Sequence, residues 1–214
     1  RKQNKERALS NLSYLRNQTN AHLHVDLIIG LPGATLDIFK ADLNELIGLG
    51  LQEVQVGILK NLKGTPLQQH IDPFQLNFER RPPYEIQSNI DLNFERMAEL
   101  RSFQKFWDKF YNSGNFIGSM RFLFSLSNPF DEFYILANYM QKTIGRDFGI
   151  SLDLLATNLH SFFTEEKGLS FTQSREMILK DILIKKDRHI PRTLRDYSLG
   201  IPRVFSKDSI KSLS

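Results

Sequence analysis

The chain has 214 residues, of which 41% are hydrophobic and 24% are charged, and its formal net charge is +4. This composition is typical of a globular protein with one large or two small cores and excludes an intrinsically disordered chain. No uncharged apolar run approaches the roughly 20 residues of a membrane-spanning helix, and no signal peptide is apparent, so we expect no membrane span and a cytoplasmic location. Because the chain has no cysteine, it offers no disulfide, thiolate nucleophile or cysteine ligand for zinc or an iron–sulfur cluster.

The first third of the chain predicts helix, strand, helix and strand. Residues 5–17 carry apolar side chains at helical spacing, and residues 22–30, HLHVDLIIG, predict a strand buried on both faces. Thr35 is a good N-cap for an amphipathic helix that stops near Gly48. Residues 53–60, EVQVGILK, predict a second strand. A strand–helix–strand unit of this length predicts two parallel strands with a right-handed crossover.

Two loops rich in glycine and proline leave these strands. They are GLPGAT at residues 30–35 and LKNLKGTPL at residues 59–67. Since parallel strands end at the same side of a sheet, both loops are expected to border one ligand-binding cleft. Glycine and proline also make short connections without a ligand, and the spacing alone leaves that alternative open.

The rest of the chain predicts a connection followed by helices. Residues 67–89 are punctuated by proline and lack a sustained period, which indicates a surface segment or a domain boundary. Four amphipathic helices are expected at about residues 97–110, 129–149, 151–162 and 172–185. Such helices with short turns predict an all-α bundle, with Trp107 and the phenylalanine stripes in its core rather than in a cofactor site.

A single strand–helix–strand unit cannot bury its own sheet, because an isolated parallel pair exposes its edges and faces. Either the helical part covers the sheet or the chain is a piece of a larger protein, and we favour the piece.

Residues 22–67 carry a specific resemblance. The strand ending in DLIIGLPG, the helix after it, and the strand VQVGILK followed by LKGTPL resemble the second half of the radical S-adenosylmethionine core. They are most similar to the cobalamin-binding class that contains the anaerobic Mg-protoporphyrin IX monomethyl ester oxidative cyclases. Farther along, the segments PPYEIQSN, FWDKFYNSGNF and LRDYSLGIPRV resemble the helical carboxy-terminal extension of these proteins.

The resemblance implies an α/β plus all-α fold, a partial β/α (TIM-like) barrel segment followed by a helical bundle domain. Its expected parts are the late barrel strands in residues 1–70, a connecting segment in 71–90 and the helical domain in 91–214. The full-length parent would use S-adenosylmethionine, a [4Fe-4S] cluster and cobalamin. This chain lacks the family's cysteine motif and cobalamin domain, so we expect a carboxy-terminal fragment that holds none of these groups alone, is inactive alone, and requires the missing amino-terminal part of the same polypeptide.

The resemblance also implies positions for cofactor contacts, without a catalytic role for any residue. The loop at the cofactor-facing edge corresponds to Gly30, Leu31, Pro32 and Gly33. The late strand near the adenosine contributes Gln55 and Leu59. The loop after that strand contains Lys60, Lys63, Gly64 and Thr65. The two lysines either hold an anionic group of cofactor or substrate, or are simply solvated.

A candidate metal site lies on the first strand. His22, His24 and Asp26 alternate with apolar residues, which places all three side chains on one face. Two imidazoles and a carboxylate can bind zinc or non-haem iron. No further ligand lies nearby in the sequence, so we expect no metal and favour polar residues that line a barrel lumen or bond across strands.

Two functions are compared. The favoured one is part of a cobalamin-dependent radical S-adenosylmethionine enzyme, an oxidative cyclase or a methyltransferase that acts on a small-molecule substrate. The alternative is a free-standing helical interaction module that binds a protein or nucleic acid through its basic carboxy-terminal end, where residues 175–214 hold ten Lys or Arg against five Asp or Glu.

The basic end lacks an aromatic-interleaved or glycine-rich recognition motif, so nucleic acid is disfavoured as a partner. Arg188, His189, Arg192 and Arg195 can bind phosphate, but a solvated segment is the preferred interpretation. A homodimer that covers the exposed sheet edge is left open.

Overall fold

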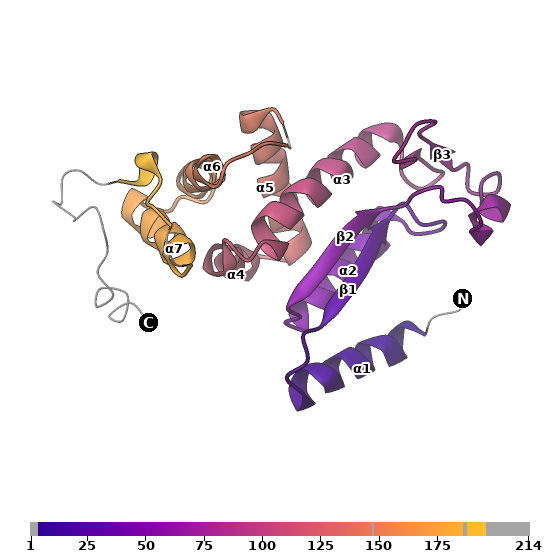
Figure 1. Ribbon diagram of the computed structural model, residues 1–214, viewed down its shortest axis with the longest axis horizontal. Coiled ribbons are helices and arrows are strands. Elements are labelled where there is room, and N and C mark those ends of the chain that lie inside the picture. The colour runs from indigo at the N-terminus through magenta and orange to yellow at the C-terminus, as the bar shows by residue number, and fades with distance from the viewer. Residues whose placement is uncertain (1–3, 147, 186–187, 196–214) are drawn as a thin grey trace.

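A computed structural model describes residues 4–146, 148–185 and 188–195 of the protein (Figure 1). The described part contains seven α-helices and two two-stranded sheets. The elements are α1 (Lys5–Gln18), β1 (His24–Ile29), α2 (Leu36–Gly48), β2 (Glu53–Ile58), a 3₁₀ turn η1 (Pro66–His70), β3 (Asn77–Phe78), β4 (Ile86–Ser88), α3 (Phe94–Trp107), a π-helical turn η2 (Asp108–Asn112), α4 (Ile117–Leu126), α5 (Pro129–Ile144), α6 (Leu152–Glu165), α7 (Phe171–Leu183) and a 3₁₀ turn η3 (Arg192–Leu194). The combination of a small α/β unit with a helical part confirms the coarse fold class, and the described strands do not close a barrel.

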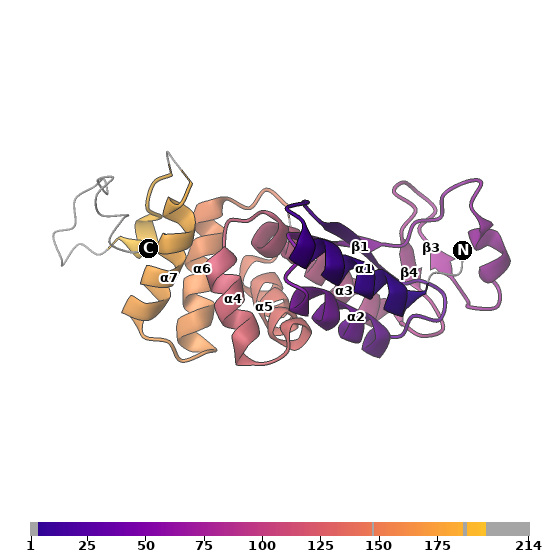
Figure 2. The ribbon, with the colours of Figure 1, turned by 90° about the horizontal axis from the view of Figure 1, so that it is seen from below.

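The molecule is elongated, with the helices α4 to α7 at one end, the β1–α2–β2 unit in the middle and the β3–β4 hairpin at the other end (Figures 1 and 2). Figure 2 shows α1 lying along the β1–α2–β2 unit. Lys5 of α1 forms ion pairs with Asp42 and Glu45 of α2, and the Arg16 Nε donates to the carbonyl of Gly50 at 2.8 Å. These contacts attach α1 to the outer side of α2.

The predicted helix starts are confirmed where a local side chain provides the cap. Thr35 accepts a hydrogen bond from the backbone of Ile38, and Asn128 and Ser151 cap α5 and α6 in the same way. The predicted end of the helix expected at residues 129–149 is wrong. It stops at Ile144 rather than near residue 149, because Gly145 adopts the left-handed conformation with φ of 69° and terminates the helix.

The strands β1 and β2 are parallel, as predicted, with His24 opposite Glu53 and Ile29 opposite Ile58. One face of this sheet packs on α2, which lies behind the strands in Figure 1. The expected burial of β1 on both faces is wrong. His24 and Asp26 are exposed, because no element within the described residues covers the opposite face.

The outer edge of β2 is covered by the helical part. The Trp107 indole Nε1 donates to the carbonyl of Val54 at 2.7 Å, and the Tyr111 hydroxyl donates to the carbonyl of Leu51 at 3.3 Å. On the opposite side of the β2 chain, beyond the end of β1, the backbone of Ile86 donates to the carbonyl of Leu59, whose own N–H donates to Ile29. Within the described residues β1 pairs with β2 alone, so the other edge of the sheet carries no strand.

The segment predicted as an irregular connection contains the short antiparallel hairpin of β3 and β4. Arg101 of α3 donates to the carbonyl of Ile86, which holds the hairpin against the helix. The segment is therefore a folded part of the structure that bridges the strand ends and α3.

The helix α4 was not predicted from the sequence. Its first residue follows Phe116, whose side chain makes no capping hydrogen bond. The cap comes from Asp181 of α7, which accepts hydrogen bonds from the backbone of Gly118 and Ser119 and from the Ser119 hydroxyl. A cap supplied from 62 residues away leaves no local start signal in the sequence.

A cluster of aromatic rings joins the α/β unit to the helical part. Phe39 of α2 contacts Phe103 and Phe130 edge to face, and Phe103 stacks on Trp107. Trp107 is fully buried, which confirms its predicted place in the core. No helix in the described part of the chain is both long and apolar enough to cross a membrane.

Candidate functional site

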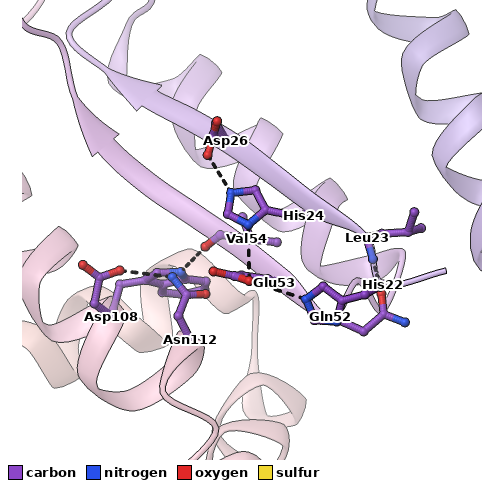
Figure 3. A network of polar contacts seen from close by, with 10 residues as sticks. His22, Leu23, His24, Asp26, Gln52, Glu53, Val54, Asp108 and Asn112 are labelled. Carbon is purple, nitrogen blue, oxygen red and sulfur yellow. Dashed lines mark hydrogen bonds and ion pairs between the residues drawn. The ribbon is translucent and has the colours of Figure 1, made fainter.

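The uncovered face of the β1–β2 sheet carries a row of polar side chains, which we call the polar face: His24, Asp26, Glu53 and Gln55. Figure 3 shows the first three of them. The parallel register places His24 beside Glu53 and Asp26 beside Gln55. The alternate residues of both strands are apolar and point to α2. The face is consequently an open polar platform on a hydrophobic support.

His24 is the centre of the polar face. Its Nε2 lies 2.9 Å from the Asp26 carboxylate, and its Nδ1 lies 3.2 Å from the Glu53 carboxylate (Figure 3). The hydrogen bond to Asp26, and then the one to Glu53, raises the pKa of His24 above its usual value. His22, near the start of the strand, contacts the same Glu53 oxygen at 3.5 Å.

The π-helical turn η2 borders this network on the side of β2. Asp108 accepts hydrogen bonds from the side-chain amides of Asn112 and Gln104, at 3.1 and 2.8 Å. Burial raises the pKa of the Asp108 carboxyl, and the negative charge of Glu53 adds to the rise. Three carboxylates and two imidazoles therefore share one region.

The arrangement does not form a metal site in the described residues, where no group of three or more His, Asp or Glu side chains is placed to hold an ion. Both ring nitrogens of His24 face carboxylate oxygens, so neither presents a free lone pair to a metal. His22 and His24 bond across strands to Glu53, whereas Asp26 bonds to His24 along the same strand.

The loop at residues 30–33 leaves β1 at the edge where β2 also ends. Gly30 is buried with φ of 89°, and a Cβ on it would lie 2.6 Å from the Ile86 Cγ2. Its carbonyl accepts a hydrogen bond from the Asn89 side chain. The hairpin therefore packs directly against the backbone of Gly30, where a side chain would not fit. Leu31 and Gly33 are exposed.

The loop at residues 59–65 leaves β2 at the same edge, and the backbone of Leu59 donates to the carbonyl of Ile29 at 3.0 Å. Lys60 forms an ion pair with Glu85 at 3.8 Å. The next three predicted positions, Lys63, Gly64 and Thr65, are exposed. We call residues 30–33 and 59–65 the strand-end loops.

The structure brings together the two strand-end loops but places Gln55 apart from them, in the middle of the polar face. A pocket of about 490 Å³ lies beside the first loop, lined by Leu36, by residues 89–93 and by three charged side chains of α3, Glu95, Arg96 and Glu99. Arg96 donates to Glu99 and to the Tyr134 hydroxyl, so its charge is already compensated. The cofactor-binding roles of the predicted residues stay predictions.

Three contributors to this region were not predicted from the sequence: Glu53, Asp108 and Asn89. Glu53 and Gln55 repeat the alternation of His24 and Asp26, so setting the two strands in parallel register would have indicated Glu53. Asp108 and Asn89 come from elements distant in sequence, and no local signal indicates them.

The basic residues near the carboxy terminus are spread over separate contacts. Arg188 donates to the side-chain carbonyl of Asn115, His189 lies 3.4 Å from Asp153, and Arg195 donates to the carbonyl of Ile190. Arg192 is exposed. Most of the segment LRDYSLGIPRV and the charged residues beyond Arg195 lie outside the described residues.

These observations define a class of protein in which an open pair of parallel strands, with loops at one edge, is joined to a helical bundle. Comparison with protein families matches residues 72–206 to the family described as "Protein of unknown function (DUF4080)", which is more than half of the chain. The chain belongs to this family, which is associated with cobalamin-binding radical S-adenosylmethionine proteins. The match begins after β2, so it covers the hairpin and the helical part. A search of curated proteins found no match.

Proposed function

We propose that this chain is the substrate-facing, carboxy-terminal part of a cobalamin-dependent radical S-adenosylmethionine enzyme of the oxidative cyclase or methyltransferase type. In this proposal residues 1–70 supply the last barrel strands, residues 71–90 connect, and residues 91–214 form a helical domain beside the barrel mouth. The family match over residues 72–206 and its association with such proteins support the proposal.

The observation that carries the proposal is the asymmetry of the two sheet edges. Trp107 bonds the outer edge of β2 at Val54, and Tyr111 bonds the chain at Leu51, just before β2. The outer edge of β1 pairs with no strand in the described residues. A further strand can therefore pair only with the free edge of β1. This is the arrangement expected of the last two strands of a larger parallel sheet.

The polar face agrees with a position inside a barrel. In a β/α barrel one face of each strand packs on helices and the other faces the lumen. Here α2 covers the apolar face, while the polar face is open and the strand-end loops lie at its carboxyl edge. Ligands bind at this edge in barrels, so a small-molecule substrate would approach from the side of the strand-end loops.

The residues present fit the proposed cofactors only in part. Without cysteine the chain cannot ligate the [4Fe-4S] cluster, and no set of side chains in the described residues is placed to hold a metal. Gln55, Lys63 and Thr65 are exposed toward the open face or edge and can form one side of an S-adenosylmethionine site. When bound to the reduced cluster, S-adenosylmethionine supplies the radical that removes hydrogen from an unreactive carbon.

The test is anaerobic production of the complete polypeptide that contains this chain, reconstitution with iron and sulfide, and an assay for 5′-deoxyadenosine. We expect production that depends on upstream cysteines. The Gln55→Ala variant should lower the rate by about tenfold, as expected when one hydrogen bond to a bound group is lost. Gln69→Ala, an exposed glutamine on η1, is the matched control and should leave the rate unchanged.

The absence of 5′-deoxyadenosine from a fully reconstituted polypeptide would overturn the proposal. An open reading frame without upstream cysteines would do the same, and salt-dependent binding to macromolecules would then support the interaction-module alternative. Within a confirmed radical enzyme, methylation or ring closure of the substrate would separate the methyltransferase from the cyclase.

A further inference from the structure

A second pocket lies at the opposite edge of the sheet from the strand-end loops. It has a volume of about 440 Å³ and is bounded by the carboxyl ends of α1 and α2, the turn η2 and the helix α4. Its apolar lining includes Ile47, Phe110, Ile117, Met120 and Phe124. This volume and this lining are typical of a site for a small apolar ligand.

Two arginines provide the charged groups of this pocket. Arg16 uses its Nε to bond the carbonyl of Gly50, which leaves the two terminal nitrogens of the guanidinium for another acceptor. Arg121 is exposed on α4, and no hydrogen bond or ion pair joins it to another described residue. The pocket lining contains no aspartate or glutamate. The two positive charges are thus uncompensated beside an apolar surface.

A third polar group of the lining lacks a partner. The side-chain oxygen of Asn112 is buried and accepts no hydrogen bond within the described part of the chain, although its amide nitrogen donates to Asp108. A buried acceptor without a donor is unfavourable, and a hydroxyl or amide group can supply that donor whereas an ionised carboxylate cannot.

We propose that this pocket binds an apolar molecule that carries one carboxylate. The hydrocarbon body packs among Phe110, Met120 and Phe124, and the guanidinium groups of Arg16 and Arg121 hold the carboxylate. Guanidinium is the side chain best suited to bind a carboxylate, and the missing acidic residues remove any internal competitor. The site lies apart from the proposed cofactor edge, so its existence does not depend on the radical chemistry.

The position of Trp107 allows binding to be followed directly. Its ring stacks on Tyr111 at 4.5 Å and lies 6.0 Å from Phe124, and both of these residues line the pocket. Because Trp107 is the single tryptophan of the chain, intrinsic fluorescence reports on this site. Decanoate, kept below its micellar concentration, is the probe, and decanol is its uncharged counterpart.

We expect decanoate to bind saturably, with a change in Trp107 fluorescence and a matching calorimetric signal. Decanol should bind at least about tenfold more weakly, which corresponds to about 1.4 kcal/mol. Equal affinity for the two probes would overturn the proposal, because the arginines would then contribute nothing. Absence of saturable decanoate binding would also overturn it.

Two variants test the charge directly. Arg121→Gln should weaken decanoate binding by about tenfold and leave decanol unchanged, since it removes one charged donor. Ile117→Glu places a carboxylate one helical turn from Arg121, at a side chain that is 48% exposed, and should abolish decanoate binding.

Arg80→Gln, an exposed arginine near the hairpin, is the matched control and should bind decanoate as the unmodified chain does. If Ile117→Glu does not fold, the Arg121→Gln result decides. Undiminished decanoate binding by Arg121→Gln would show that no carboxylate site exists here.

Discussion

The indole nitrogen of Trp107 lies 2.7 Å from the backbone carbonyl of Val54, at a point on the outer edge of β2 where a neighbouring strand would otherwise bond. A side chain of α3 therefore takes the place of a strand. This one contact joins the helical part to the parallel strand pair and gives the sheet a definite last strand.

Substitution of Trp107 by phenylalanine should destabilise the protein strongly. The change leaves the Val54 carbonyl buried without a donor and removes part of a fully buried ring, with an expected loss of about 2 to 4 kcal/mol. Urea unfolding followed by circular dichroism measures it. Tyr111→Phe is the control, because its bond to Leu51 is longer at 3.3 Å, and it should cost about 1 kcal/mol or less. Equal unfolding midpoints for the two variants would contradict this account of the edge.

Substitution of Asp181 by asparagine should weaken the attachment of α4 to α7. The carboxylate is 4% exposed and accepts three hydrogen bonds at 2.6 to 2.7 Å from Gly118 and Ser119. In asparagine one of the two accepting oxygens is replaced by an NH2 group, which faces an N–H or O–H donor of Gly118 or Ser119 and cannot accept its hydrogen bond. Unfolding measurements are therefore expected to show a loss of about 3 kcal/mol. The control Asp72→Asn, at an exposed loop position, should change stability by less than about 0.5 kcal/mol. A small effect at residue 181 would mean that α4 has another source of capping.

Gly30→Ala should be more destabilising than Gly145→Ala. Both glycines have positive φ, of 89° and 69°, so both substitutions incur backbone strain of about 1 to 2 kcal/mol. Only at Gly30 would the new Cβ meet another group, the Ile86 Cγ2 at 2.6 Å, which adds about 1 to 3 kcal/mol of overpacking. Thermal or urea unfolding of the pair isolates the contact with the hairpin. If both variants lose the same stability, the loop does not pack on Ile86 in solution.

The polar face should show a distinct dependence on pH. The hydrogen bonds to Asp26 and Glu53 raise the pKa of His24 above 6.5 in the folded chain. A histidine of this kind adds stability that is complete below its ordinary pKa and is lost as the pH rises through the raised value. The difference in unfolding free energy between the unmodified chain and His24→Gln should therefore shrink as the pH rises from below 6.5 through the raised pKa of His24.

A titration of the histidine ring protons by NMR measures the pKa of His24 itself. Asp26→Asn removes the first cause of the shift and should move the pKa of His24 back toward its ordinary value. His160 is the internal comparison, because burial, with the nearby Arg175 adding to it, lowers the pKa of its ring. A His24 pKa at or below the ordinary value would show that the ring does not pair with these carboxylates.

Much of the fold was predictable because its signals are local. The N-caps at Thr35, Asn128 and Ser151 and the apolar spacing after them predict three of the helices. The order strand, helix, strand predicts parallel pairing, and with it the meeting of the strand-end loops. The candidate site was predictable to the same extent, with the loops and His24 indicated and Glu53 and Asp108 missed.

The sequence by itself determined most of the helices, the strands β1 and β2 and the polar side of β1, because periodicity and capping act over a few residues. Only the tertiary structure decided that α4 forms under Asp181, that Trp107 closes the edge of β2, and that Arg16 and Arg121 line one pocket. Each of these depends on groups that are far apart in the chain and meet only when the aromatic core brings the helices onto the sheet. No local sequence pattern predicts these contacts, because a hydrogen bond or a pocket between distant segments depends on how the helices and strands pack.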